Sequence, residues 1–95
     1  MSTTRQLAAI LFADIQGFTS LMEKDEAKAT QFREKLKGYL EQEVTNHNGR
    51  VLKFSGDGAL CMFQSAIEAV HAAIALQRLM LLKPVVPLRI GIHEG

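Results

Sequence analysis

The chain has 95 residues, 47% of them hydrophobic, so it can form one compact domain with a modest core but not two. Eleven lysines and arginines balance ten aspartates and glutamates, and the formal charge of +1 gives no reason to expect a nucleic acid or an anionic membrane as partner. A single cysteine argues against a disulfide scaffold, and no apolar stretch is long enough to span a membrane. The sequence therefore predicts a soluble, cytoplasmic module.

The first half of the chain predicts a strand followed by two helices. Leu7–Ala13 is an almost unbroken apolar run, which indicates a strand buried on both faces, with a buried helical turn as the alternative. A short helix is expected over Ile15–Met22. Asp25 then caps a longer helix, from Glu26 to about His47, which Gly49 stops.

The second half predicts a hairpin, a helix and a last strand. Arg50–Phe54 and Ala59–Phe63 are typical of strands, and the Asp-Gly pair within Ser55–Gly58 favours a tight turn between them. Apolar residues recur at helical spacing over Gln64–Lys83, until a proline ends the pattern. Leu88–Ile92 closes the chain as a strand.

This order of elements predicts an α+β fold. Strand, two helices, two strands, helix and strand form the ferredoxin-like pattern, with one antiparallel sheet covered by helices on one face. Both alternating faces of the first and third strands are apolar, yet the helices can cover only one of them. The other face should then be covered by further chain or by a second molecule, which indicates a dimer.

Two carboxylates are expected to meet at one edge of this sheet. The first and third strands are antiparallel neighbours, so Asp14 at the end of one lies beside Asp57 at the start of the other. Taken singly, Asp14 is more typical of a helix cap and Asp57 of a turn. Two adjacent carboxylates repel each other unless a multivalent cation lies between them, and magnesium suits such oxygen ligands. The backbone N–H groups of Gly17, Phe18 and Thr19 could hold a polyphosphate beside them.

Three segments resemble the signature segments of class III adenylate and guanylate cyclases. They are LFADIQGFTSL (residues 11–21), GRVLKFSGDGALCMF (49–63) and LRIGIHEG (88–95), and they occur in the family's order over almost the whole chain. The resemblance implies the nucleotide cyclase fold in truncated form. Residues 1–95 are then expected to be a partial class III catalytic domain, namely its N-terminal half.

The resemblance also implies roles for individual residues. Asp14 and Asp57 would bind two Mg²⁺ or Mn²⁺ ions with the help of the backbone carbonyl of Ile15. Lys53 would bind adenine, because a lysine can donate to the purine where guanylate cyclases have a carboxylate. The β- and γ-phosphates would lie against the backbone of Gln16, Gly17, Phe18 and Thr19.

The implied activity is that of an adenylate cyclase, which forms 3′,5′-cyclic AMP and pyrophosphate from ATP by attack of the ribose 3′-hydroxyl on the α-phosphorus. Each site would be shared across a head-to-tail homodimer, with Asp14 and Asp57 from one subunit and Lys53 from the other. The family's transition-state asparagine and arginine follow the GIHEG segment, past Gly95, so no catalytic residue beyond the metal ligands is expected within the chain. The 95 residues alone are therefore expected to bind metal-nucleotide weakly and to have little or no cyclase activity.

Three alternatives stay open. A guanylate cyclase would differ mainly in the base that it binds. A diguanylate cyclase shares a similar sheet, but its hairpin reads GGDEF or GGEEF, whereas residues 54–58 read FSGDG here. A catalytically silent module that senses nucleotide or drives dimerisation would need neither carboxylate.

Overall fold

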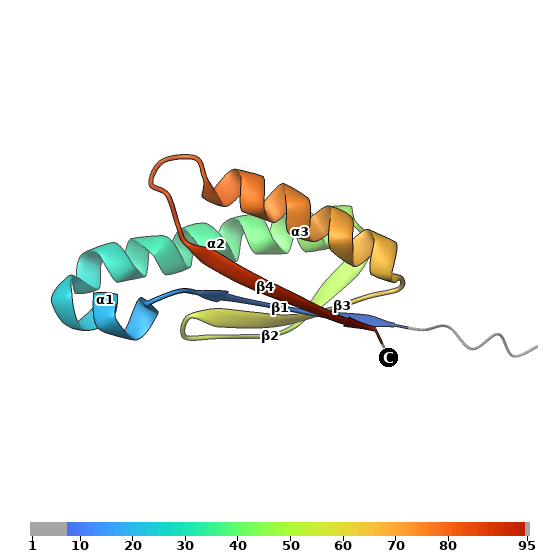
Figure 1. Ribbon diagram of the computed structural model, residues 1–95, viewed down its shortest axis with the longest axis horizontal. Helices are drawn as coiled ribbons and strands as arrows, with labels where there is room; N and C mark the ends of the chain where they lie inside the picture. Colours follow the sequence, from blue (N-terminus) through green and yellow to red (C-terminus); the bar gives the residue numbers. More distant parts are fainter. Residues whose placement is uncertain (1–7, 95) are drawn as a thin grey trace, which may run out of the picture.

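Residues 8–94 are the part of the chain that the computed structural model describes. Their strands form one antiparallel sheet, and helices cover one of its faces (Figure 1). The elements are β1 (Ala9–Ile15), α1 (Phe18–Lys24), α2 (Glu26–Asn46), β2 (Gly49–Ser55), β3 (Gly58–Phe63), α3 (Ala66–Met80) and β4 (Leu88–Glu94). The sheet order is β2-β3-β1-β4, and each neighbouring pair is antiparallel. The predicted ferredoxin-like α+β fold is confirmed.

Two predictions reach residues that lie outside this described range. The first strand was predicted to begin at Leu7, and the last signature segment of the family resemblance ends at Gly95. Both residues are outside residues 8–94, so these two predictions stay predictions. The strand and helix bounds given above therefore apply to residues 8–94.

The junction between β1 and α1 differs from the predicted boundaries. The short helix was predicted over residues 15–22, but Ile15 is the last residue of β1 and α1 begins at Phe18. Ile15 stays in the strand because it pairs with Leu88 of β4. Gly17 takes the left-handed conformation directly before the helix, so the helix cannot begin earlier.

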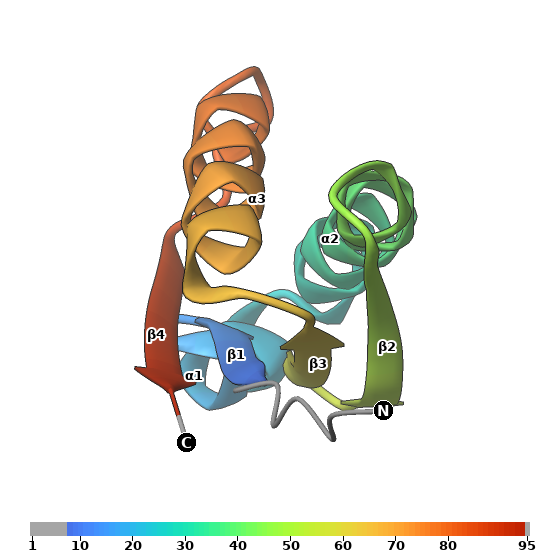
Figure 2. The same ribbon diagram turned by 90° about the vertical axis from the view of Figure 1, so that its right-hand side faces the viewer.

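One face of the sheet packs against α2 and α3, which lie side by side above it (Figure 2). Alternation along β1 decides which side chains enter the core, because successive residues of a strand point to opposite faces. Four residues of β1 are at most 2% exposed. They are Ala9, Leu11, Ala13 and Ile15. Leu36 and Leu40 of α2 and Leu76 and Met80 of α3 complete this core.

The opposite side of the sheet, called the open face below, carries apolar side chains without helical cover. Phe12 is 50% exposed, and Ile10, Leu60 and Met62 are partly exposed beside it. The register places them in rows across the strands, with Phe12 opposite Leu60 and Ile10 opposite Met62. The sequence predicted that the first and third strands are apolar on both faces, and this arrangement confirms it.

The loop between α2 and β2 differs from the prediction. Asp25 caps α2 as expected, since its side chain accepts a hydrogen bond of 3.1 Å from the Lys28 N–H. Gly49, however, does not stop the helix. Asn48 takes the left-handed conformation (φ 62°), and Gly49 already belongs to β2. Glycine is needed there for space, because a Cβ atom would lie 2.5 Å from the Phe63 ring.

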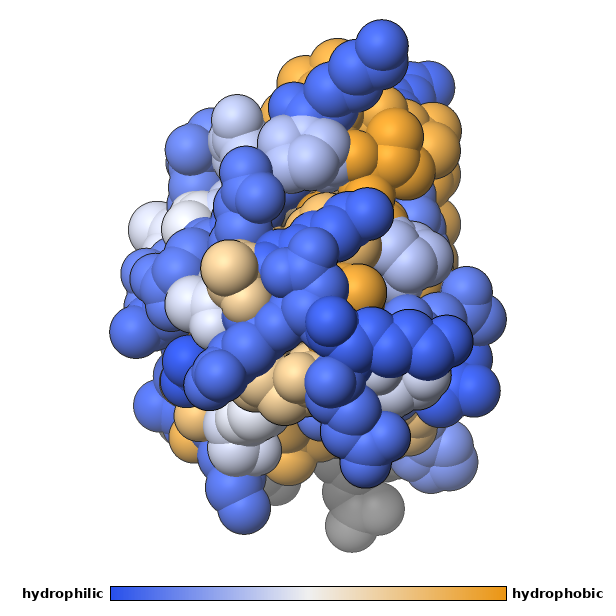
Figure 3. Space-filling view, turned by 90° about the vertical axis from the view of Figure 1, so that its left-hand side faces the viewer, coloured by the Kyte–Doolittle hydropathy of each residue, from blue (hydrophilic) through white to orange (hydrophobic). Residues whose placement is uncertain are grey.

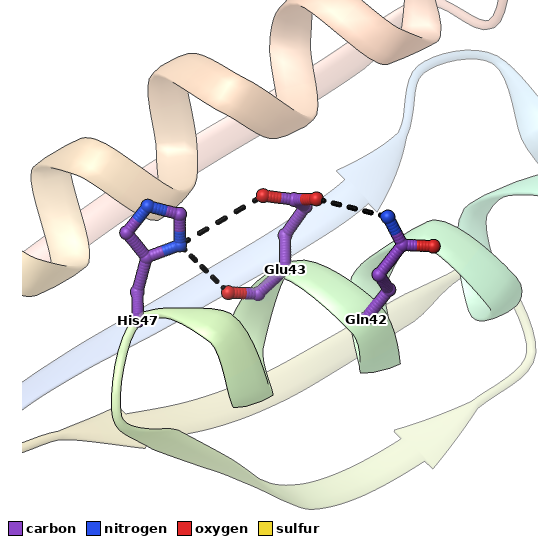
Figure 4. A network of polar contacts seen from close by, with 3 residues as sticks. All are labelled: Gln42, Glu43 and His47. Carbon is purple, nitrogen blue, oxygen red and sulfur yellow. Dashed lines mark hydrogen bonds and ion pairs between the residues drawn. The ribbon is translucent and has the colours of Figure 1, made fainter.

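Polar contacts fix the C-terminal turn of α2 (Figure 4). His47 Nδ1 lies 2.8 Å from the backbone carbonyl oxygen of Glu43 and 3.8 Å from the Glu43 carboxylate. The Gln42 side-chain amide donates to the other carboxylate oxygen over 3.3 Å. The Glu43 carbonyl also accepts the backbone N–H of His47 over 3.2 Å, so the ring of His47 adds a second contact at the last turn of the helix.

The segment from α3 to β4 is tied to α2 but leaves apolar side chains on the surface. Helix α3 ends at Met80, before the predicted end at Lys83. The Lys35 ammonium of α2 donates to the carbonyls of Leu82 and Pro84, the latter over 2.8 Å. Hydrophobic side chains gather at the upper right of Figure 3, on the side of α3, and Leu81 is 66% exposed.

No helix within residues 8–94 combines the length and apolar character needed to cross a membrane.

We expect Cys61 to be unreactive in the folded chain. Its side chain is fully buried in β3, and burial raises the pKa of the thiol to about 11. At pH 8 only about one thiol in a thousand is then ionised, and the thiolate is the reactive form. Labelling with a thiol reagent, followed by mass spectrometry, should show no modification in buffer and complete modification in concentrated urea. Rapid labelling of the native chain would contradict this assignment.

Candidate functional site

Asp14 and Asp57 are brought together by the pairing of β1 with β3. Asp14 lies opposite Gly58 in the register, and the Cα atoms of such partners are roughly 4.5–5.5 Å apart. The next N–H group, that of Ile15, donates to the backbone carbonyl of Asp57 over 2.9 Å. The hairpin turn is thereby fixed to the end of β1, with one carboxylate on each side of the junction.

Gly58 allows this close approach because it has no side chain. A Cβ atom on Gly58 would lie 2.9 Å from the carbonyl oxygen of Ala13 and 3.2 Å from the Cβ of Asp14. Gly56 adopts φ 49°, which the tight two-residue turn between β2 and β3 requires. The Asp-Gly pair that predicted the turn therefore also sets the distance between the strands at the site.

The two carboxylates border two adjacent hollows on the surface. Lys53, Phe12 and Leu60 line a hollow of about 300 Å³ on the open face, together with Asp14 and Asp57. The same two aspartates also line a second hollow of about 440 Å³. Its other lining residues are Ile15, Gln16, Gly17, Phe18, Thr19, Ser20 and Arg89. Volumes of this size are within the range of small-molecule sites.

A larger hollow of about 500 Å³ lies at the opposite end of the sheet, where Gly49 and Phe63 pair. Its described lining residues include Arg50 and Gln64 but neither an aspartate nor a glutamate. The hollows at the two aspartates combine acidic, basic and backbone groups, so they are the stronger candidates for chemistry.

Backbone rather than side chains shapes the loop between β1 and α1. Gly17 takes the left-handed conformation (φ 70°) at the start of α1, and no side chain caps this helix. The Gln16 N–H donates to the carbonyl of Pro87 over 2.9 Å, which fixes the loop to the segment before β4. The Ile15 side chain is buried in the core, and the residue also lines the second hollow.

Lys53 lies on the open face of the same chain. It is exposed on β2, opposite Leu60 of β3, and a register irregularity between Val51 and Lys53 marks a bulge in this edge strand. The family resemblance assigned Lys53 of one subunit to the carboxylates of another. In the structure, Lys53 already borders the hollow that contains Asp14 and Asp57 of its own chain.

Arg89 is a site residue that the sequence analysis missed. It lies opposite Asp14 on β4, and its guanidinium donates to both carboxylate oxygens of Asp14, over 3.3 Å from Nε and 3.2 Å from Nη2. The side chains are 69% and 40% exposed, and such surface pairs contribute roughly 0.2–1 kcal/mol. Only the β1–β4 register could have revealed this pair, and the sequence did not define that register.

The donor set suits a hard divalent cation. Two carboxylates and backbone oxygens are the ligands that Mg²⁺ and Mn²⁺ prefer, and Mg²⁺ commonly binds through one or two carboxylates together with substrate phosphates. Within residues 8–94, no three His, Cys, Asp or Glu side chains form a group that could hold a metal ion. Asp14 and Asp57 would therefore be the only carboxylate ligands from this part of the chain.

Sequence comparison finds a relative among bacterial cyclases. The chain is 49% identical over 80 residues to a protein of Rhizobium meliloti (strain 1021) named "Putative adenylate cyclase 3". The matched region is 83% of this chain but only 14% of the relative. No protein-family model matches the sequence.

Solved structures share the fold. The adenylyl cyclase CyaB from P. aeruginosa matches with a TM-score of 0.78 and 26% identity, over 100% of this chain and 59% of its own length. The guanylyl cyclase Cya2 matches with a TM-score of 0.77 and 25% identity, over 100% of this chain and 57% of its own length. The chain thus spans little more than half of these two proteins.

We expect Gly58→Ala to destabilise the fold, whereas Gly38→Ala should stabilise it. The new Cβ at Gly58 would push β1 away from β3, and overpacking of this kind costs about 1–3 kcal/mol. Gly38 lies within α2 with open space around it, and alanine is favoured over glycine in a helix by roughly 0.5–1 kcal/mol. Urea unfolding followed by circular dichroism would measure both changes. Equal stability of the two variants would show that the strands do not need a glycine at the site.

Proposed function

Because the chain has the fold of class III nucleotidyl cyclase catalytic domains and is 49% identical over 80 residues to an adenylate cyclase relative, we propose that it forms part of an adenylate cyclase catalytic domain. The reaction would convert ATP to 3′,5′-cyclic AMP and pyrophosphate. The observation that supports this proposal most is the convergence of Asp14 and Asp57 at one rim, between a hollow with Lys53 and a hollow with a backbone loop.

Asp14 and Asp57 would hold two Mg²⁺ or Mn²⁺ ions, with the carbonyl of Ile15 as a further ligand. Both side chains lie at the surface, where ions can keep water and phosphate ligands. Bound ions would lower the pKa of the ribose 3′-hydroxyl and offset the negative charge of the triphosphate. The task of the chain is to hold the two carboxylates at a fixed separation, which the β1–β3 pairing does.

The loop from Gln16 to Thr19 would bind the β- and γ-phosphates. Gly17 exposes backbone at the start of α1, and backbone N–H groups are good donors to phosphate oxygens. The hydrogen bond from Gln16 to Pro87 keeps this loop in place before substrate binds, which reduces the ordering cost of binding.

Lys53 would select adenine over guanine. Its ammonium can donate a hydrogen bond to an acceptor on the adenine ring, and guanine presents a donor at the corresponding position. Phe12 and Leu60 border the hollow that contains Asp14 and Asp57 of their own chain, so they would offer apolar surface to the base, which Lys53 of the second subunit would contact. The base would then lie on the open face and the phosphates beyond the rim, with the aspartates between them.

The open face would be covered by a second subunit, in a homodimer with two sites. Its apolar side chains lie beside the proposed base site, so a subunit packed there would also exclude water from the nucleotide. In this arrangement Lys53 of one subunit would serve the carboxylates of the other.

Substitution of either aspartate should abolish turnover in a catalytic domain of full family length that includes these residues. Asp14→Asn and Asp57→Asn each remove a cation ligand, and loss of several kcal/mol of charge stabilisation lowers the rate about a hundredfold or more. Cyclic AMP and cyclic GMP formation would be measured with ATP and GTP. Glu41→Gln, on the exposed side of α2, is the control and should keep full activity. Unchanged turnover in both aspartate variants would refute Asp14 and Asp57 as cation ligands, whereas no turnover in the unsubstituted domain would favour a silent nucleotide-sensing module.

Mixing two inactive subunits should restore activity if the site is shared. Asp14→Asn damages the carboxylate half of a site and Lys53→Glu the base half. A mixed dimer of these variants has one site without substitution, so an equal mixture should recover about a quarter of wild-type activity. If Lys53 instead serves the aspartates of its own chain, mixing restores nothing. Size-exclusion chromatography would verify that mixed dimers form.

A further inference from the structure

The ion pair between Arg89 and Asp14 occupies the atoms that a cation would need. Arg89 donates to both carboxylate oxygens of Asp14 at once, over 3.3 Å and 3.2 Å. The two residues are direct cross-strand partners, so the backbone register itself keeps their side chains together. A cation that binds either oxygen therefore meets a guanidinium that is already there.

We propose that Arg89 is an internal counter-ion of Asp14, which a divalent cation must displace in order to bind this carboxylate. This inference rests on the proposed function, because it takes Asp14 as a cation ligand. It adds a competition between a residue of the chain and the metal ion for the same carboxylate.

Charge explains why the two aspartates would need such a residue. Asp14 and Asp57 border the same two hollows at the end of the β1–β3 pair, and two neighbouring carboxylates without a counter-ion repel each other. Arg89 offsets the charge of Asp14 from one side, and Lys53 borders the pair from the other. The rim therefore holds two positive and two negative side chains.

Exposure explains why the pair can be opened. The Arg89 side chain is 69% exposed and that of Asp14 is 40% exposed, so water and salt screen their attraction. A divalent ion carries twice the charge of the guanidinium in a smaller volume and can replace it at the carboxylate. Arg89 would therefore lower the affinity of Asp14 for a divalent cation without preventing the cation from binding.

Arg89→Gln should tighten cation binding. Removal of the competing pair is expected to lower the dissociation constant of Mn²⁺ by about two- to fivefold at low ionic strength. Binding of Mn²⁺ to the 95-residue chain would be measured by the loss of the electron paramagnetic resonance signal of the free ion, without nucleotide. Arg89→Lys keeps the positive charge but cannot donate to both carboxylate oxygens in the bidentate geometry of arginine. Its affinity for Mn²⁺ should therefore lie between those of the wild type and Arg89→Gln.

Arg50→Gln is the matched control. Arg50 is an exposed arginine on the open face, opposite Met62 near the other end of the sheet, and its loss removes the same charge from the chain. The affinity of the Arg50→Gln variant for Mn²⁺ should equal that of the wild type. Unchanged or weaker binding by Arg89→Gln, with its fold verified by circular dichroism, would overturn the proposal.

Two further variants separate this proposal from the proposed function. Asp14→Asn and Asp57→Asn should each weaken Mn²⁺ binding. If both bind the ion as tightly as the wild type, the cation site itself is wrong, and the proposed function loses its support. If they weaken binding while Arg89→Gln changes nothing, the cation site stands and only the competition is refuted.

Discussion

The antiparallel pairing of β1 with β3 is the constraint on which the candidate site depends. It sets Asp14 opposite Gly58, and the hydrogen bond from Ile15 to Asp57 holds the hairpin turn against the end of β1. The same strands form the centre of the sheet and carry much of the core. The stability of the sheet and the position of the two carboxylates therefore depend on the same backbone hydrogen bonds. A change that shifts the β1–β3 register would move both carboxylates.

Much of the fold was predictable because its local signals agree. Apolar runs marked β1 and β3, Asp25 marked the start of α2, and the Asp-Gly turn marked the hairpin. These signals act over a few residues, which is why a single sequence reveals them. The order of elements then left few ways to arrange the sheet, and the expected meeting of Asp14 with Asp57 followed from that order.

The features that the sequence did not reveal depend on contacts between distant segments. Arg89 becomes a partner of Asp14 only through the β1–β4 register, 75 residues apart in the chain. Lys35 holds the carbonyls of the segment before β4, which no local pattern announces. Asn48 takes the left-handed conformation after α2, and Gly49, which was predicted to stop the helix, instead leaves room for the Phe63 ring.

The two edges of the sheet differ in how they would meet another strand. Strand β2 has a bulge next to Lys53, and bulges and lysines both disfavour pairing with a foreign strand. Strand β4 pairs with β1 without interruption, and in the described part of the chain its outer edge has no partner strand. Ile92, on that strand, is an exposed hydrophobic residue. Aggregation of these 95 residues in concentrated solution would therefore start at β4, and a lysine in place of Ile92 is the first change to try in preparing the chain for spectroscopy.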